Sequence, residues 1–187
     1  MKKHRLIYFN APITLTFVGI CLAVLGLDYL THGVSTTKFF ATYGSSFLDP
    51  LMYVRLIGHV FGHINIDHLI NNMLFILLLG PILEEKYGNK LMIVILVTAL
   101  VTGIAHNILS PKTMLLGASG VVFAFILLAS VTGRDEGIPI TLILVAILWI
   151  GGEIYDSVST VDNVSQITHI IGGISGAAMG LTFKRKR

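Results

Sequence analysis

The sequence predicts an all-α membrane protein, a single domain over residues 1–187 built as a bundle of six transmembrane helices. Hydrophobic residues make up 54% of the chain and charged residues only 12%, which is too apolar for a soluble domain of this size. The apolar residues gather in six runs, each long enough or nearly long enough to cross the ~30 Å hydrocarbon layer of a bilayer. These runs lie near residues 11–30, 56–83, 91–109, 118–132, 138–155 and 167–183.

The first run, 11–30, follows a basic N-terminal segment, as a signal peptide would. No small-residue cleavage site follows the run before Asp28, so we expect it to be retained as a membrane span. The long connection that comes next, residues 31–54, carries aromatic side chains among glycines and serines. This composition favours a first loop that lies in the outer membrane interface.

Turn-forming residues separate the later runs, among them Asn89, Pro111 and the segment 137–139. The fourth run, 118–132, is too short to cross the hydrocarbon layer. We therefore expect the fourth helix to start inside the membrane. Non-helical backbone at that depth is tolerated only when it is buried in protein or lines a water-filled cavity.

The distribution of basic residues predicts the orientation in the membrane. With six crossings, ten lysines and arginines fall on the face that carries both termini, and three fall on the opposite face, so the shared face should be cytoplasmic. This asymmetry also explains the net charge of +3 without a nucleic-acid partner. The ten are Lys2, Lys3, Arg5, Lys86, Lys90, Arg134, Lys184, Arg185, Lys186 and Arg187, and the three are Lys38, Arg55 and Lys112.

The motif Gly117-Ala118-Ser119-Gly120 sets a serine where a polar loop gives way to an apolar helix. A serine at a helix N-terminus lies beside unpaired backbone N–H groups, so it can act as a nucleophile whose oxyanion is stabilised nearby. The alternative is a patch of small residues that lets membrane helices pack closely.

The predicted depth in the membrane indicates which polar side chains can lie near this serine. Ser119 and His169 each lie fifteen residues from the basic residue that ends their helix on the cytoplasmic side. At 1.5 Å per residue, each lies roughly 22 Å above that cytoplasmic end. His68 and Asn72 bracket that level at roughly 24 and 18 Å, and their i, i+4 spacing puts them on one face. His106 also lies about 24 Å up, so depth alone leaves it as a rival base.

The last run carries small residues on one face, which predicts close packing against the fourth helix. Such packing would bring His169 within hydrogen-bond reach of the Ser119 hydroxyl. The residues expected to meet are Gly172, Gly176 and Gly180 on the last helix and Ala118, Gly120 and Ala124 on the fourth.

A metal site at His59, His63 and His68 is the competing reading of the second run, since two of these lie at i, i+4. No carboxylate or cysteine completes a ligand set nearby, so we expect neither a metal nor a cofactor. The single cysteine, Cys21, excludes an intramolecular disulfide.

Taken together in this order, these motifs resemble the rhomboid intramembrane serine proteases in their basic six-helix bacterial form, from about Arg55 to the C-terminus. The matching elements are His59-x3-His63-x4-His68-x3-Asn72, Gly117-Ala118-Ser119-Gly120, and His169 followed by Gly172 and Gly176. The resemblance implies that Ser119 is the nucleophile and His169 its general base. The two form a dyad that lacks the carboxylate residue of a serine-protease triad. It also implies an oxyanion hole made by His68, Asn72 and the Ser119 N–H.

Further residues take supporting roles by the same resemblance. Glu84 matches the acidic residue that ties the cytoplasmic side together, and Trp149 would border the gate through which a substrate helix enters. Phe123 stands where the family often has tyrosine; it keeps the ring that stacks on the catalytic histidine. The pair Val54-Arg55 replaces a Trp-Arg pair in the first loop.

The predicted function is that of a serine endopeptidase in the plasma or inner membrane, cleaving transmembrane segments of single-span or polytopic membrane proteins near their outer end. The active site should open to the extracytoplasmic side. The alternative is a catalytically silent relative that binds transmembrane clients, although such a protein has no reason to keep both Ser119 and His169. A transporter or channel would need charged partners along a continuous path, which the inner halves of these helices lack.

Overall fold

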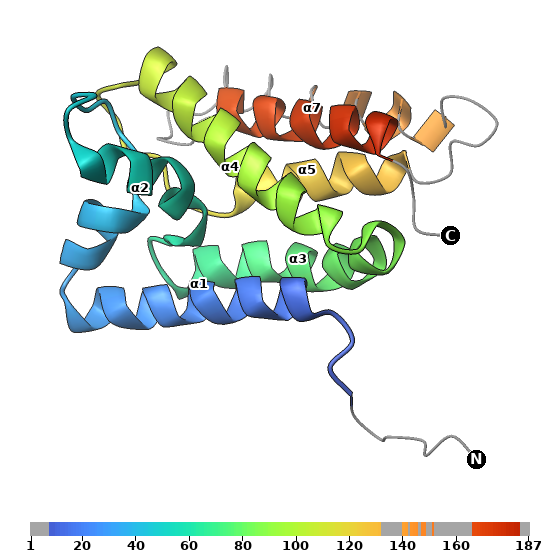
Figure 1. The fold of residues 1–187 in the computed structure, drawn as a ribbon, viewed down its shortest axis with the longest axis horizontal. Coiled ribbons are helices and arrows are strands. Elements are labelled where there is room, and N and C mark those ends of the chain that lie inside the picture. Colours follow the sequence, from blue (N-terminus) through green and yellow to red (C-terminus); the bar gives the residue numbers. More distant parts are fainter. Residues whose placement is uncertain are drawn as a thin grey trace.

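The computed structural model describes residues 8–131 and 166–183, together with eight residues between 140 and 151. Its regular secondary structure is helical throughout the described residues, apart from one isolated β-bridge between Thr42 and Leu115. Figure 1 shows the helices lying side by side in one bundle. The predicted fifth helix, 138–155, and Trp149 lie largely or wholly outside the described residues.

Among the described residues, three helices are long and apolar enough to cross a membrane: α1 (Pro12–Leu30), α3 (Ile66–Tyr87) and α4 (Lys90–Leu109). They present large apolar side chains outward, such as Leu74 and Leu78 on α3, which are 64% and 61% exposed. Exposed apolar surface on this scale suits contact with lipid. The prediction of an all-helical membrane bundle is confirmed.

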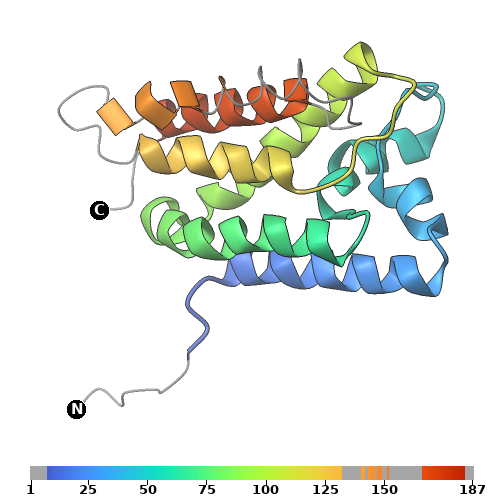
Figure 2. The same cartoon turned by 180° about the vertical axis from the view of Figure 1, so that it is seen from behind.

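Two shorter helices complete the described bundle, α5 (Ser119–Ser130) and α7 (Gln166–Thr182). The 12 residues of α5 rise only about 18 Å, well short of the hydrocarbon layer. Both views place α5 between α7 and α3, with α1 on the outside of α3 (Figures 1 and 2). The N-terminus of α5 therefore lies within the bundle.

The second membrane helix begins later than the apolar run 56–83 predicts. The segment before it forms α2 (Pro50–Gly58) and a 3-10 turn (His59–Phe61), and α3 starts only at Ile66. Gly62 is extended, and the Asn65 side chain caps α3 by accepting from the His68 N–H at 2.8 Å. The break lies at exposed residues, with Ile64 67% exposed, and the capping residue Asn65 is the local sequence signal for it.

Glu84 of α3 holds the start of α1. Its carboxylate accepts hydrogen bonds from the Ile13 N–H at 2.9 Å, the Thr14 N–H at 3.0 Å and the Thr14 hydroxyl at 2.9 Å. These N–H groups belong to the first turn of α1, where no intrahelical acceptor exists, and a carboxylate there also complements the helix dipole. Glu84 therefore fixes α1 against α3 at the end of the bundle near the chain's N-terminus.

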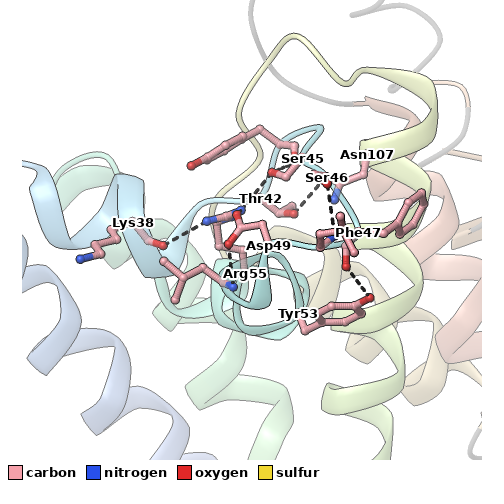
Figure 3. Close-up of polar contacts among 12 residues, drawn as sticks. Lys38, Thr42, Ser45, Ser46, Phe47, Asp49, Tyr53, Arg55 and Asn107 are labelled. Carbon is pink, nitrogen blue, oxygen red and sulfur yellow. Dashed lines mark hydrogen bonds and ion pairs between the residues drawn. The ribbon is translucent and has the colours of Figure 1, made fainter.

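The first loop is held by Arg55, which is 3% exposed although it is charged. Figure 3 shows its guanidinium between Asp49, Ser45 and the carbonyl of Lys38, and it forms an ion pair with Asp49. The hydrogen bond from Arg55, which favours the charged carboxylate, holds the pKa of Asp49 below its ordinary value. The buried guanidinium of Arg55 thus holds the first loop against α2.

Candidate active site

Ser119 and His169 meet near the N-terminal ends of α5 and α7, which lie side by side (Figures 1 and 2). The His169 Nε2 atom lies 2.9 Å from the Ser119 Oγ atom, within hydrogen-bond distance, although the residues are 50 positions apart in the chain. Equal depth leaves His169 and His106 as rivals, and the small-residue face of the last run predicts that His169 can approach Ser119. The pair has the geometry in which a neutral imidazole can take the proton of a hydroxyl.

Glycines on α7 make this approach possible. A Cβ atom on Gly172 would lie 2.4 Å from the carbonyl oxygen of Gly120, and one on Gly176 would lie 2.1 Å from that of Ala124. No side chain fits in either space. The backbones of α5 and α7 therefore touch, as the predicted small-residue face requires, and the distance from Ser119 to His169 depends on it.

The loop before Ser119 has an unusual backbone at Gly117, whose φ is +122°. Residues with a Cβ rarely adopt this conformation, whereas glycine does so freely. The Gly117 N–H donates to the His59 carbonyl at 2.9 Å, and Leu115 exchanges two hydrogen bonds with Thr42, each 2.9 Å. The loop is thus anchored to both the 3-10 turn and the first loop.

His68 and Asn72 lie against this loop. A Cβ atom on Gly117 would meet the His68 ring at 2.7 Å and would lie 3.8 Å from Asn72 Nδ2. The Asn72 amide donates to the His68 backbone carbonyl at 3.2 Å, and the i, i+4 spacing puts the two side chains on one face of α3. Two side chains with N–H donors therefore lie beside the residue two positions before Ser119.

Ring contacts involve both His169 and His68. The Phe123 ring centroid lies 4.8 Å from that of His169 with the planes tilted by 42°, a tilted contact rather than a parallel stack. The His63 ring packs edge-on against His68 at 5.0 Å, and the His63 Nδ1 atom lies 3.2 Å from the Phe61 carbonyl oxygen. These contacts restrict rotation of the His169 and His68 rings.

The rival histidine, His106, is directed elsewhere. Its Nε2 atom lies 3.0 Å from the carbonyl oxygen of Thr113, in the loop that follows α4. His59 is also engaged, with Nδ1 at 3.3 Å from the Arg55 carbonyl oxygen and Nε2 at 3.3 Å from the Thr102 hydroxyl. Within the described part of the chain, no three His, Cys, Asp or Glu residues are grouped so that they could hold a metal ion.

Two features of the site were not predicted from the sequence: the positive φ of Gly117 and the bridge between Thr42 and Leu115. A glycine in a loop just before a helix is a weak hint of a positive φ. The bridge joins segments 73 positions apart and has no local signal.

The fold and the site define a class: a helical membrane protein with a serine and a histidine in hydrogen-bond contact inside the bundle. Comparison with protein families names it further, because the family described as "Rhomboid domain" matches residues 50–186. The chain belongs to the rhomboid family.

Curated relatives carry the name rhomboid protease GlpG. The relative from Yersinia pestis (strain Pestoides F) is 27% identical over 175 residues, which cover 90% of this chain and 61% of the relative. The relative from Serratia proteamaculans (strain 568) is 26% identical over 182 residues, which cover 94% of this chain and 64% of the relative. The chain thus spans a little over three fifths of the length of the curated relatives it matches.

Proposed function

We propose that this chain is an intramembrane serine endopeptidase that cleaves membrane-protein substrates with a dyad of Ser119 and His169. The observation that carries the proposal is the 2.9 Å contact between His169 Nε2 and Ser119 Oγ. The family and the printed names of the relatives support the class of reaction.

In the proposed mechanism, neutral His169 takes the proton from Ser119 as the hydroxyl oxygen attacks the scissile carbonyl carbon. His169 then returns the proton to the leaving amine, which departs and leaves an acyl-enzyme. Water, deprotonated by His169, hydrolyses this ester and restores Ser119. Packing of the Phe123 ring against the imidazole would help to orient His169.

The tetrahedral oxyanion needs donors, and the proposal assigns this role to His68, Asn72 and the Ser119 N–H. The Ser119 N–H belongs to the first turn of α5 and has no intrahelical acceptor, so it is available to an incoming oxygen. His68 and Asn72 lie against the loop that leads to it. Removal of one such donor typically lowers the rate by about 10²–10³.

The proposed substrate is a transmembrane segment that unwinds near its outer end. An intact helix hides its carbonyl carbons behind hydrogen-bonded turns, so small or helix-breaking residues there would help. With both termini in the cytoplasm, α5 would begin toward the outer side, and the site would open in that direction. Trp149 and the predicted fifth helix keep their proposed place at the substrate gate.

The decisive experiment measures cleavage of a panel of single-span substrates in liposomes by the wild type and by Ser119→Ala, His169→Ala and His106→Ala. We expect no detectable cleavage by the first two variants. His106→Ala should keep activity within about tenfold of wild type, because its ring contacts Thr113 rather than Ser119. Thermal unfolding of each variant controls for loss of fold.

Two outcomes would contradict the proposal in different ways. Loss of cleavage with His106→Ala, together with activity in His169→Ala, would move the general base to α4. A wild-type protein that cuts no substrate, and whose Ser119 does not react with a serine-directed phosphonate, would favour a silent relative that binds transmembrane clients.

A further inference from the structure

The loop that leads to Ser119, residues 110–118, runs from the end of α4 to the start of α5 and is paired with the first loop. Thr42 of the first loop is fully buried, and it exchanges two backbone hydrogen bonds with Leu115, each 2.9 Å long. Leu115 lies four positions before Ser119. The pairing therefore fixes the backbone one short step before the proposed nucleophile.

The side chain of Thr42 reaches a third segment. Its hydroxyl donates to Asn107 Oδ1, in the last turn of α4, at 3.0 Å (Figure 3). The neighbouring residue on α4, His106, contacts the same loop directly, since its Nε2 atom lies 3.0 Å from the Thr113 carbonyl oxygen. Two adjacent residues of α4 thus hold the loop 110–118, one of them directly and the other through Thr42.

The first loop has little room to shift on either side of Thr42. Just before it, the Phe40 carbonyl oxygen lies so close to Gly62 that a Cβ on this glycine would collide with it. Just after it, the Gly44 N–H donates to the Pro111 carbonyl at 3.0 Å, and a Cβ on Gly44 would lie 2.5 Å from the Pro111 Cβ. Thr42 is therefore a fixed point against which the loop 110–118 can be held.

The position of Leu115 bears on the proposed oxyanion hole. Gly117 lies two residues after Leu115, and its backbone, with a positive φ, packs against the His68 ring. The Ser119 N–H, a proposed donor, follows two residues later. A misplacement of about 1 Å in a catalytic group can lower a rate by about 10²-fold. A small shift of Leu115 should therefore be felt at the donors.

We propose that Thr42 is a positioning residue for the loop 110–118 of the proposed protease. Its hydroxyl, bound to Asn107, fixes its backbone against α4, and its backbone in turn fixes Leu115. The placement of the Ser119 N–H follows from this register. Thr42 acts through the loop and not on the substrate itself. The inference rests on the proposed function, because it takes Ser119 to be the nucleophile.

Thr42→Val tests the hydroxyl, because valine has nearly the shape of threonine but cannot donate a hydrogen bond. We expect kcat for cleavage in liposomes to fall by about tenfold or more, while KM stays nearly unchanged, because the loop is misplaced and the substrate contacts are kept. Phosphonate labelling of Ser119 should slow in parallel. Thr42→Ser, which keeps the donor, should recover most of kcat.

The matched control is Thr14→Val, which removes another buried threonine hydroxyl. Thr14 is 1% exposed, and its hydroxyl donates to the Glu84 carboxylate at 2.9 Å, far from the loop 110–118 at the other end of the bundle. This variant should also lower the thermal unfolding temperature, but it should keep kcat near that of wild type when assayed below its transition. Equal losses of kcat in Thr14→Val and Thr42→Val would overturn the inference, because general stability would then explain both.

A double-mutant cycle tests the route through Asn107. If the Thr42 hydroxyl acts through this amide, Thr42→Val should have little further effect in an Asn107→Ala background, in kcat and in hydrogen exchange of the loop 110–118. Effects of the two substitutions that simply add would overturn the inference.

Hydrogen exchange of the loop separates this inference from the proposed function, because it needs no catalysis. Thr42→Val should speed exchange of the Leu115 and Gly117 N–H groups, and Thr14→Val should not. Unchanged exchange in Thr42→Val would overturn the inference even if the wild type is a protease. A wild type that cuts nothing would contradict the protease, whereas faster exchange in Thr42→Val would still support Thr42 as the residue that positions the loop.

Discussion

At the scale of single residues, the site depends on groups whose neighbours are fixed by packing. His169 and His106 have similar predicted depths, yet only His169 contacts Ser119, because His106 is held by the carbonyl of Thr113. Gly117 is equally constrained: its φ is +122°, and the His68 ring occupies the space where a side chain would begin.

Gly117→Ala tests this constraint. A positive φ costs a residue with a Cβ about 1–2 kcal/mol, and the methyl group would also displace His68. We expect proteolysis to fall by about 10² or more, as for loss of an oxyanion donor, in an assay of kcat/KM.

Gly33→Ala is the control for the backbone strain that a positive φ causes in a residue with a Cβ. Gly33 also has a positive φ, +86°, but its Cβ would meet nothing within 4 Å. This variant should lose some stability and keep kcat/KM close to that of wild type, because its Cβ displaces no neighbouring group. Equal activity losses in the two variants would show that displacement of the His68 ring does not explain the effect of Gly117→Ala.

At the scale of helices, α5 and α7 pack with backbone against backbone. Since α5 is too short to span the membrane, its position depends on its neighbours rather than on lipid on both sides. The glycine spacing on α7 therefore sets the distance within the proposed dyad.

Gly176→Ala should force α5 and α7 apart, because its Cβ would lie 2.1 Å from the Ala124 carbonyl oxygen. We expect the free energy of unfolding to fall by about 1–3 kcal/mol, as in overpacked cores, and the rate of phosphonate labelling at Ser119 to fall with it. Unfolding can be followed by steric trapping in bicelles.

Gly26→Ala on α1 is the matched control, since a Cβ there meets nothing within 4 Å. Alanine is the better helix former by about 1 kcal/mol, so this variant should be neutral or slightly stabilised. If both variants behave alike, close packing of α7 on α5 does not determine the reactivity of Ser119.

At the scale of the whole molecule, the chain is a helical membrane protein of the rhomboid family, and the distribution of positive charge predicts its orientation. The turn between α3 and α4 and the turn after α4 lie at opposite ends of a spanning helix. They therefore report on the two sides of the membrane.

Cysteine labelling tests this topology. In a Cys21→Ala background, Lys112→Cys should react with a membrane-impermeant maleimide in intact cells, because the turn after α4 is expected outside. Asn89→Cys should react only after the membrane is permeabilised. Both residues are exposed in turns, so local burial does not limit either reaction. The reverse pattern would invert the topology and place the proposed active site toward the cytoplasm.

The sequence by itself determined the helical membrane class, the extents of α1 and α4, and the small-residue face of α7, because these depend on composition and on spacing along one helix. It also identified Ser119 and His169 as a pair of equal depth. The apolar run 56–83 did not predict the break between the 3-10 turn and α3, although the capping residue Asn65 is a local signal for it.

Only the tertiary structure decided which histidine meets Ser119, since rotation about a helix axis is set by packing and not by depth. It alone revealed the positive φ of Gly117 and the bridge that joins Thr42 to Leu115. These features join residues from different helices and loops. No pattern within a single segment encodes such contacts, because they form only when the separate elements pack together.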